Sequence, residues 1–218
     1  VFTDSNHNIW AGHERGFSLA SASNIVRTIK LGTMAHTGEG NEIHSILRDS
    51  RNDLWLGGTN GVIRLSEGKQ AAWYRHTDGP AALSHNRIRD IDEDRDHRVW
   101  LSTDGGLNRY NPATGGFDVF HVVDRNGEHN SNWVYSFEES RDAYWVGSFL
   151  SGLHRVGKTA FGATGGTVVS DCSLNADSRP SGGTRLVNDL FNNMATDTEG
   201  NLWILFFRDD ALYRYSAV

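Results

Sequence analysis

Tryptophan recurs along this chain at a fixed spacing, and that spacing restricts the possible folds more than any other feature. The first four repeat tryptophans are 45 residues apart and the next follows after 58, giving the series Trp10, Trp55, Trp100, Trp145 and Trp203. An acidic residue stands six positions before each one, in the series Asp4, Asp49, Asp94, Glu139 and Asp197. Self-similarity with a period of about 40–50 residues indicates a repeat architecture whose units pack on their neighbours.

The residues around each tryptophan predict four short β-strands per repeat. Turn-favouring polar residues separate the acid from the tryptophan, and alternating segments such as 43–47 and 54–56 flank this turn. A Gly-x-x-Arg phrase, for example at 106–110, and an irregular aromatic segment supply the third and fourth strands. Four strands in about 45 residues correspond to one blade of a β-propeller. The sequence therefore predicts an all-β propeller forming a single domain over 1–218, with five blade repeats at approximately 1–40, 41–85, 86–130, 131–185 and 186–218.

The repeat tryptophans are expected to lie in the core between neighbouring blades. A small residue two positions after the tryptophan lets the next sheet approach, and it is found at Gly12, Gly57, Ser102 and Gly147. Trp133 stands 45 residues after Ile88, so the same spacing predicts that it is also buried. The 13 extra residues before Trp203 fall in a Gly- and Ser-rich stretch, 157–185, which is expected to be an extended inter-blade loop.

The two ends of the sequence predict an open ring. Most of the first strand is missing from the first repeat, and the fifth repeat ends without a fourth strand. Because unpaired strand edges invite association, we expect either an arc of a larger ring or a homodimer that pairs these edges. A five-bladed disc with an imperfect seam is the alternative.

Composition disfavours several classes of function. The net charge of −6 comes from interspersed acids and bases, so no basic stripe predicts nucleic-acid binding. Cys172 is the single cysteine, so no intrachain disulfide can form. A phosphate-loop formula at 152–159 lies on a predicted strand instead of before a helix. No His-Glu-x-x-His motif, calcium loop or nucleophile elbow is present, and we expect no cofactor, no metal and no catalytic residue.

The combination Asp-x5-Trp followed by Gly-Leu-x-Arg-Tyr, with the phrase at 105–112 as its clearest copy, resembles the two-component regulator propeller repeat. The first repeat departs from it, with Leu19 in place of the arginine. The resemblance implies the extracytoplasmic, periplasmic sensor region of a bacterial hybrid histidine kinase, with seven blades to a ring. It also implies a ligand related to carbohydrate breakdown products, and the remainder of the sensor kinase as partner.

One face of the propeller is expected to bind the ligand. The loops between second and third strands differ from repeat to repeat, and variation on a rigid scaffold favours binding specificity. The predicted ligand-binding residues are Arg15, Asn60, Asp104, Phe149 and Arg208. Phe149 would supply a stacking surface, and the arginines would donate to an acidic or hydroxylated ligand. The leading hypothesis is a non-catalytic sensor of a small, carbohydrate-like molecule. Alternatives are a lyase resembling streptogramin lyase, with a metal-assisted histidine site, and the accessory propeller of a carbohydrate-active enzyme.

Overall fold

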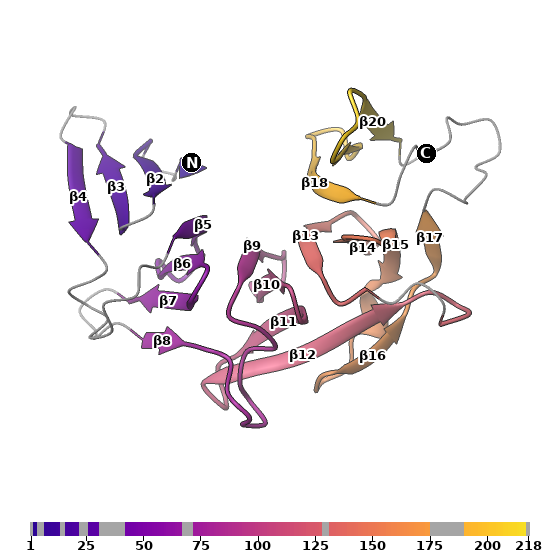
Figure 1. Cartoon of the computed structure of the whole chain (residues 1–218), viewed down its shortest axis with the longest axis horizontal. Helices are drawn as coiled ribbons and strands as arrows, with labels where there is room; N and C mark the ends of the chain where they lie inside the picture. The colour runs from indigo at the N-terminus through magenta and orange to yellow at the C-terminus, as the bar shows by residue number, and fades with distance from the viewer. Residues whose placement is uncertain are drawn as a thin grey trace.

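The computed structural model describes residues 2–3, 7–13, 16–21, 26–30, 42–66, 72–127, 131–174 and 190–216. Within these ranges the strands form five sheets arranged as successive blades along an open arc, whose gap lies between the first and the last blade (Figure 1). The predicted fold class, an all-β propeller of five blade repeats, is confirmed. No helix in these ranges has the length and apolarity needed to cross a membrane.

Each blade is a meander of short strands, and the first strand of blades two to five lies nearest the centre of the arc (Figure 1). In the described ranges, blade one contains β1 (Phe2–Thr3), β2 (Ile9–His13), β3 (Gly16–Ala20) and β4 (Val26–Lys30), and blade two contains β5 (Ile43–Arg48), β6 (Leu54–Gly58), β7 (Gly61–Leu65) and β8 (Ala72–Tyr74). Blade three contains β9 (Ile88–Glu93), β10 (Val99–Thr103), β11 (Gly106–Asn111) and β12 (Gly116–Val123), and blade four contains β13 (Val134–Glu139), β14 (Ala143–Ser148), β15 (Gly152–Gly157) and β17 (Cys172–Leu174). Blade five contains β18 (Phe191–Thr196), β19 (Leu202–Phe206) and β20 (Leu212–Tyr215).

In blades two, three and five, the turn between the first two strands is built around the acidic residue. In blade three, Asp94 accepts hydrogen bonds from the amides of Asp96 and Arg98, both at 3.0 Å. The residue three positions after the acid has a left-handed backbone, with φ of 61° at His97 and 85° at Gly200. Asn, His and Gly tolerate this conformation better than most residues, which explains the composition of the turns.

Trp10, Trp55, Trp100 and Trp145 fill the space between blades, as expected, whereas Trp203 in the last blade is only half-buried. Trp55 packs with Ile88 and Val99 of blade three, and Trp100 packs with residues of blade four such as Phe137. Both indoles are almost fully buried. Removing an indole from water contributes about 4–6 kcal/mol at roughly 25 cal/mol per Å². This burial is therefore a main source of cohesion between neighbouring sheets.

The small residues after the tryptophans permit this close approach. A Cβ atom placed on Gly57 would lie 2.5 Å from Cγ2 of Ile88, and one on Gly147 would lie 2.1 Å from the ring of Phe191. Both contacts are far inside van der Waals distance, so any larger residue would push the next blade away.

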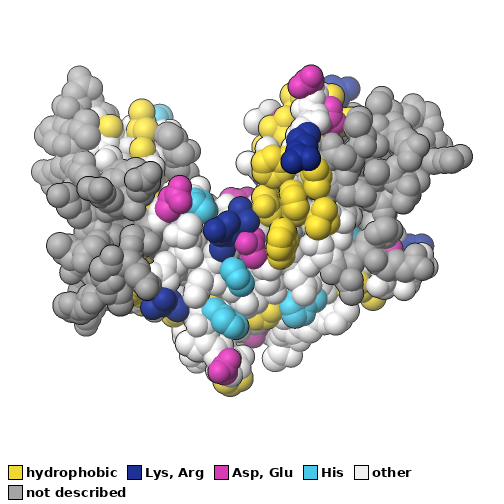
Figure 2. Space-filling model, in the orientation of Figure 1, with side chains coloured by type: hydrophobic (Ala, Val, Ile, Leu, Met, Phe, Trp, Pro, Cys, Tyr) yellow, Lys and Arg dark blue, Asp and Glu magenta, His cyan; other side chains and the backbone are white. Residues whose placement is uncertain are grey.

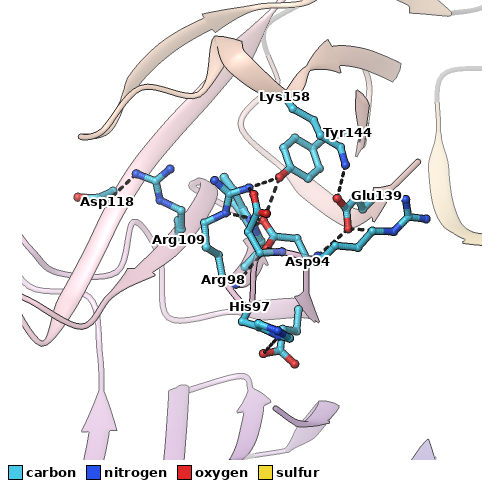
Figure 3. Close-up of polar contacts among 12 residues, drawn as sticks. Asp94, His97, Arg98, Arg109, Asp118, Glu139, Tyr144 and Lys158 are labelled. Atoms are coloured by element: carbon cyan, nitrogen blue, oxygen red, sulfur yellow. Dashed lines mark hydrogen bonds and ion pairs between the residues drawn. The ribbon is translucent and has the colours of Figure 1, made fainter. Parts of the chain in front are cut away.

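Polar side chains connect the same blades at the turn side of the core (Figure 3). The hydroxyl of Tyr144 on β14 donates to Asp94 at 2.9 Å, and the Arg98 guanidinium donates to both groups. The Glu139 carboxylate accepts a hydrogen bond from the ammonium group of Lys158. Burial alone would raise the pKa of Asp94, but donors from Trp100, Arg98 and Tyr144 together hold it below its usual value. The carboxylate is therefore ionised and shared between two blades.

Blade four departs from the 45-residue spacing by one position. Val99 pairs with Glu93 in blade three, whereas its counterpart Tyr144 pairs with Glu139, which stands 46 residues after Glu93. Val134 therefore takes the buried position of Ile88, with 2% of its surface exposed. The prediction that Trp133 is buried was wrong: it lies just outside the strand and is 45% exposed.

The same shift changes the role of Glu139. It accepts the amide of Arg95 from the preceding turn at 2.7 Å, as Glu93 accepts the amide of Ser50 at 2.8 Å. The turn of blade four is instead closed by Ser140, whose hydroxyl and amide both donate to the carbonyl of Ala143 at 2.9 Å.

The stretch 157–185, expected to be an irregular loop, contains two strands in its described part. β16 (Gly166–Val169) pairs in parallel with β12 and so adds a fifth strand to blade three, while β17 completes blade four. The expectation of an irregular loop was therefore wrong for 166–169 and 172–174. The additional residues fasten blade four to the outer edge of blade three, which covers an otherwise unpaired strand.

Candidate ligand-binding site

The loops after the second strands are fastened in the same way in blades two to five. In each blade, the amide following the second strand donates to the carbonyl of the residue preceding the first strand. The pairs are Thr59 with Glu42 (3.1 Å), Asp104 with Arg87 (3.4 Å), Phe149 with Trp133 (2.9 Å) and Phe207 with Leu190 (2.7 Å). These two positions and the second residue of the first strand (His44, Arg89, Tyr135 and Asn192) are here called the rim positions. They form one structurally equivalent set on the loop face of the arc.

Aromatic residues occupy the rim positions of blade four and part of blade five. The rings of Trp133 and Phe149 stack with centroids 5.6 Å apart, and those of Phe149 and Tyr135 stack at 5.3 Å. Phe207 contacts both Tyr135 and Phe149 edge-on, at 5.8 and 6.0 Å. This cluster, here called the aromatic rim, leaves Trp133 45% and Phe207 38% exposed. Clustered exposed aromatic surface is typical of a binding site.

Charged residues occupy the same positions in blade three. Nε and Nη2 of Arg89 donate to the two carboxylate oxygens of Asp104 at 2.7 and 3.0 Å. Nε of Arg87 lies 3.8 Å from the same carboxylate. In blade two, Glu42 and His44 lie 3.7 Å apart. The rim is thus charged over blades two and three and aromatic over blades four and five.

The two halves meet between blades three and four. The Arg89 guanidinium carbon lies 4.2 Å from the centre of the Tyr135 ring, a cation–π contact. Figure 2 shows hydrophobic side chains gathered over blades four and five, with basic, acidic and histidine side chains beside them. A ligand on this surface can therefore contact apolar rings and charged groups together.

Backbone strain marks the loops of the aromatic half. Leu150 and Arg208, which follow Phe149 and Phe207, have φ of 70° and 58°. In blades two to four, the glycine that begins the third strand also has a positive φ, at Gly61, Gly106 and Gly152, so the positive φ of Leu150 is additional. A bulky residue in the left-handed region costs about 1–3 kcal/mol and is frequent at functional sites. Leu150, which follows Phe149 in the chain, is exposed.

The structure brings some of the predicted ligand-binding residues together. Asp104 and Phe149 belong to one chain of contacts through Arg89 and Tyr135. Arg15 lies outside the described residues. The predicted roles of all these residues in ligand binding stay predictions.

Asn60 and Arg208 stand one residue beyond the rim positions of their blades. Asn60 is 9% exposed, and its carbonyl accepts the indole N–H of Trp73 at 2.9 Å, so it contributes to packing within blade two. Arg208 is exposed beside Phe207. The loops between second and third strands differ in length from blade to blade. A residue chosen only because it lies in such a loop can therefore stand one residue away from the rim position.

Sequence reasoning missed Trp133, Tyr135, Arg89 and Phe207. Trp133 was assigned to the core by the 45-residue spacing, which fails by one position in blade four. Arg89 and Tyr135 lie on first strands, outside the loops where binding residues were expected. An aromatic pair at 133 and 135, where the equivalent residues of blade three are both arginine, was the available signal.

Half-buried acids lie beside the site on the first strands. Asp90, next to Arg89, accepts the hydroxyls of Ser45 at 3.4 Å and Ser136 at 3.0 Å, and so connects three blades. Burial raises the pKa of Asp90, and burial together with the charges of Asp90 and Glu138 raises the pKa of Asp92 well above its usual value.

Glu138 belongs to the same group of acids. Burial raises its pKa to about 7, although the Thr196 hydroxyl donates to it at 2.9 Å. In the described part of the chain, no three His, Cys, Asp or Glu side chains are grouped so that they could hold a metal ion.

Comparison with known proteins identifies the repeats. The model of the family described as two component regulator propeller matches residues 37–60 and 82–105. No curated protein matches this chain. Among solved structures, the extracellular domain of a protein described as the hybrid two component system BT4673 of B. thetaiotaomicron is 34% identical, with a TM-score of 0.76 over 99% of this chain. The corresponding domain of BT3049 of the same organism is 17% identical, with a TM-score of 0.68 over 94% of this chain.

A more distant likeness concerns the fold alone. Virginiamycin B lyase from Staphylococcus aureus is 10% identical, with a TM-score of 0.67; the match covers 99% of this chain and 65% of the lyase. The chain spans only 29% of the BT4673 structure and 25% of the BT3049 structure. The spacing of tryptophans and turn acids, the blade architecture, the family match and the likeness to BT4673 agree with one another. The chain therefore carries repeats of the two component regulator propeller type, at residues 37–60 and 82–105, and is similar over its length to part of the extracellular domain of BT4673.

Proposed function

We propose that this chain is part of an extracytoplasmic sensor and that its aromatic rim binds a small, carbohydrate-like molecule without converting it. The observation that carries the proposal is the partly exposed stack of Trp133, Phe149 and Tyr135 at the rim positions of blade four. Sugar rings present flat C–H faces that pack on aromatic rings, and polar hydroxyls that bind nearby donors and acceptors. The aromatic rim and the adjacent Arg89–Asp104 pair offer both kinds of contact.

The family supports the sensing role. The similar domains of BT4673 and BT3049 are extracellular domains of proteins described as hybrid two component systems. In such a system, ligand binding outside the cell controls an output inside it. We propose the same arrangement here, with the remainder of a sensor kinase as the partner of this chain.

The rim also suits recognition by binding instead of by catalysis. The Asp104 carboxylate is held on both oxygens by Arg89, and the Arg89 guanidinium is packed on Tyr135. These groups are oriented by strong mutual contacts, which favours a preformed binding surface.

The proposal is tested by titrating the 218-residue chain calorimetrically with a panel of neutral and acidic oligosaccharides. A saccharide that binds the native chain should bind Trp133→Ala and Phe149→Ala about tenfold or more weakly, because truncating a central aromatic contact commonly costs 2 kcal/mol or more. The saccharide should be recovered unchanged after incubation.

Two substitutions serve as controls. Trp73→Ala removes a partly exposed tryptophan from the outer strand β8, and Arg51→Ala removes an exposed side chain from the turn face. Neither should change the affinity. Unaltered binding by both rim variants, or loss of binding in Arg51→Ala, would show that the aromatic rim is not the site.

A further inference from the structure

We infer that the ligand of the aromatic rim is an acidic saccharide, in which at least one sugar unit carries a carboxylate or sulfate group that binds beside Arg87 and Arg89. The inference rests on the proposed function and narrows its ligand class. It depends on the charges and donors at the junction of blades three and four.

Blade three has an excess of positive charge at its rim positions. Asp104 is the single carboxylate there, and both of its oxygens already accept hydrogen bonds from Arg89. The second guanidinium, that of Arg87, has its Nε 3.8 Å from Asp104, too far for a hydrogen bond, and its side chain is 46% exposed. One negative charge thus faces two positive charges, which leaves Arg87 available to an anion from solution.

Arg89 also retains donor capacity. Its contacts with Asp104 use Nε and Nη2, and within the described ranges its Nη1 makes no hydrogen bond. The Tyr135 ring and the Asp104 carboxylate fix the plane of the guanidinium, so little side-chain freedom remains to be lost on binding. A planar, preoriented guanidinium suits carboxylate and sulfate groups.

The neighbouring contacts set the place of the anion relative to the sugar ring. From Arg89, the planar groups continue through Tyr135 to Phe149 at 5.3 Å and then to Trp133 at 5.6 Å. On the other side, blade two presents Glu42, whose carboxylate would repel an anion. A saccharide with its ring on the exposed part of Trp133 and its acidic group directed toward blade three would contact both the aromatic rings and the arginines, and would keep its anion away from Glu42.

The test compares trisaccharides by calorimetry on the 218-residue chain at low salt. The ligands are a trigalacturonate, the neutral galactose trisaccharide of the same linkage, and a sulfated form of that neutral trisaccharide. We expect at least one acidic trisaccharide to bind about tenfold or more tightly than the neutral one, since a hydrogen bond to a charged group is worth about 1.5–3 kcal/mol. This preference should shrink in 0.5 M NaCl, because salt screens exposed charges.

Three variants separate the charge from the aromatic contact. Arg87→Ala should remove most of the preference for the acidic ligand while leaving neutral binding within about twofold. Arg89→Lys should weaken binding of the acidic ligand more than binding of the neutral one. Trp133→Ala should weaken all three ligands. Arg51→Ala, which removes an exposed arginine from the turn face, should change none. Circular dichroism and thermal melting check that each variant is folded.

The outcomes distinguish the inference from the proposed function. Equal affinity for neutral and acidic ligands, sensitive to Trp133→Ala but not to the arginine variants, overturns the inference and keeps the saccharide site. Absence of binding for all three ligands overturns the inference, while the wider panel decides the proposed function. A preference for one acidic form over the other shows whether carboxylate or sulfate is the recognised group.

Discussion

Replacing Asp94 by Asn tests how a turn acid holds two blades together. Its Oδ1 accepts the amides of Asp96 and Arg98, both at 3.0 Å. Its Oδ2 accepts the Trp100 indole at 2.8 Å, the Arg98 guanidinium at 2.7 Å and the Tyr144 hydroxyl at 2.9 Å. One carboxylate thus fixes its own turn, the indole between the blades and a side chain of the next blade.

The magnitude follows from these contacts. An asparagine keeps one oxygen and replaces the other by an amide that cannot accept, so the buried indole of Trp100 and the hydroxyl of Tyr144 lose their acceptor. Each unsatisfied buried donor costs about 1–3 kcal/mol. The Arg98 side chain is 34% exposed, so water compensates for part of its lost partner. We expect Asp94→Asn to lower the free energy of unfolding by about 3–5 kcal/mol.

The effect should also depend on pH. Because its pKa is lowered in the folded state, Asp94 contributes stability that is present above its unfolded pKa and lost as the pH falls through its folded pKa. The difference between native chain and variant should therefore be largest near neutral pH and decrease in acid.

Urea denaturation followed by tryptophan fluorescence measures this difference, and Asp197→Asn is the matched control. Asp197 makes the same bond to its tryptophan, at 2.9 Å to Trp203, but the described residues place no further blade beyond it. Its substitution should cost clearly less. Equal losses at the two positions, or a loss under about 1 kcal/mol for Asp94→Asn, would refute the argument that burial between blades gives the acid its importance.

Further predictions concern packing and titration. Trp100→Ala should cost about 3–5 kcal/mol because it leaves a cavity between blades, whereas Trp133→Ala should cost under about 1 kcal/mol because that indole is exposed; denaturant titration compares them. Gly147→Ala should lower the melting temperature, because its Cβ would lie 2.1 Å from the ring of Phe191. Glu138, with its pKa raised to about 7, contributes stability that is present below its unfolded pKa and lost as the pH rises through about 7. The free energy of unfolding measured from pH 4 to 8 should therefore fall less for Glu138→Gln than for the native chain, by up to about 3 kcal/mol at the high-pH end. Parallel pH curves for the two proteins would contradict a raised pKa of Glu138.

Local sequence was sufficient to predict the blades. The acid and the tryptophan six residues later predict a turn and a buried side chain between blades, and the structure shows both at Asp49–Trp55 and Asp94–Trp100. The small residue after the tryptophan was also predictable, because the distance between sheets leaves no space for a side chain at Gly57. These features depend on residues close in sequence or on contacts repeated at every blade boundary.

The register of blade four and the partner of β16 could not be read from the sequence. A one-residue shift in the first strand exchanges buried and exposed positions, and so moves Trp133 to the surface and Val134 into the core. The pairing of β16 with β12 joins residues about 46 positions apart, and nothing local in 166–169 specifies that edge.

The candidate site was predictable from the sequence only in part. Sequence variation among the repeats predicted the loop face and, on it, Asp104 and Phe149, which the structure connects through Arg89 and Tyr135. It did not identify Arg89 and Tyr135, which belong to the first strands of two different blades and contact each other at 4.2 Å. The sequence by itself determined the repeat, its strands and its core; only the tertiary structure decided which variable residues meet, because that depends on the register and packing of neighbouring blades.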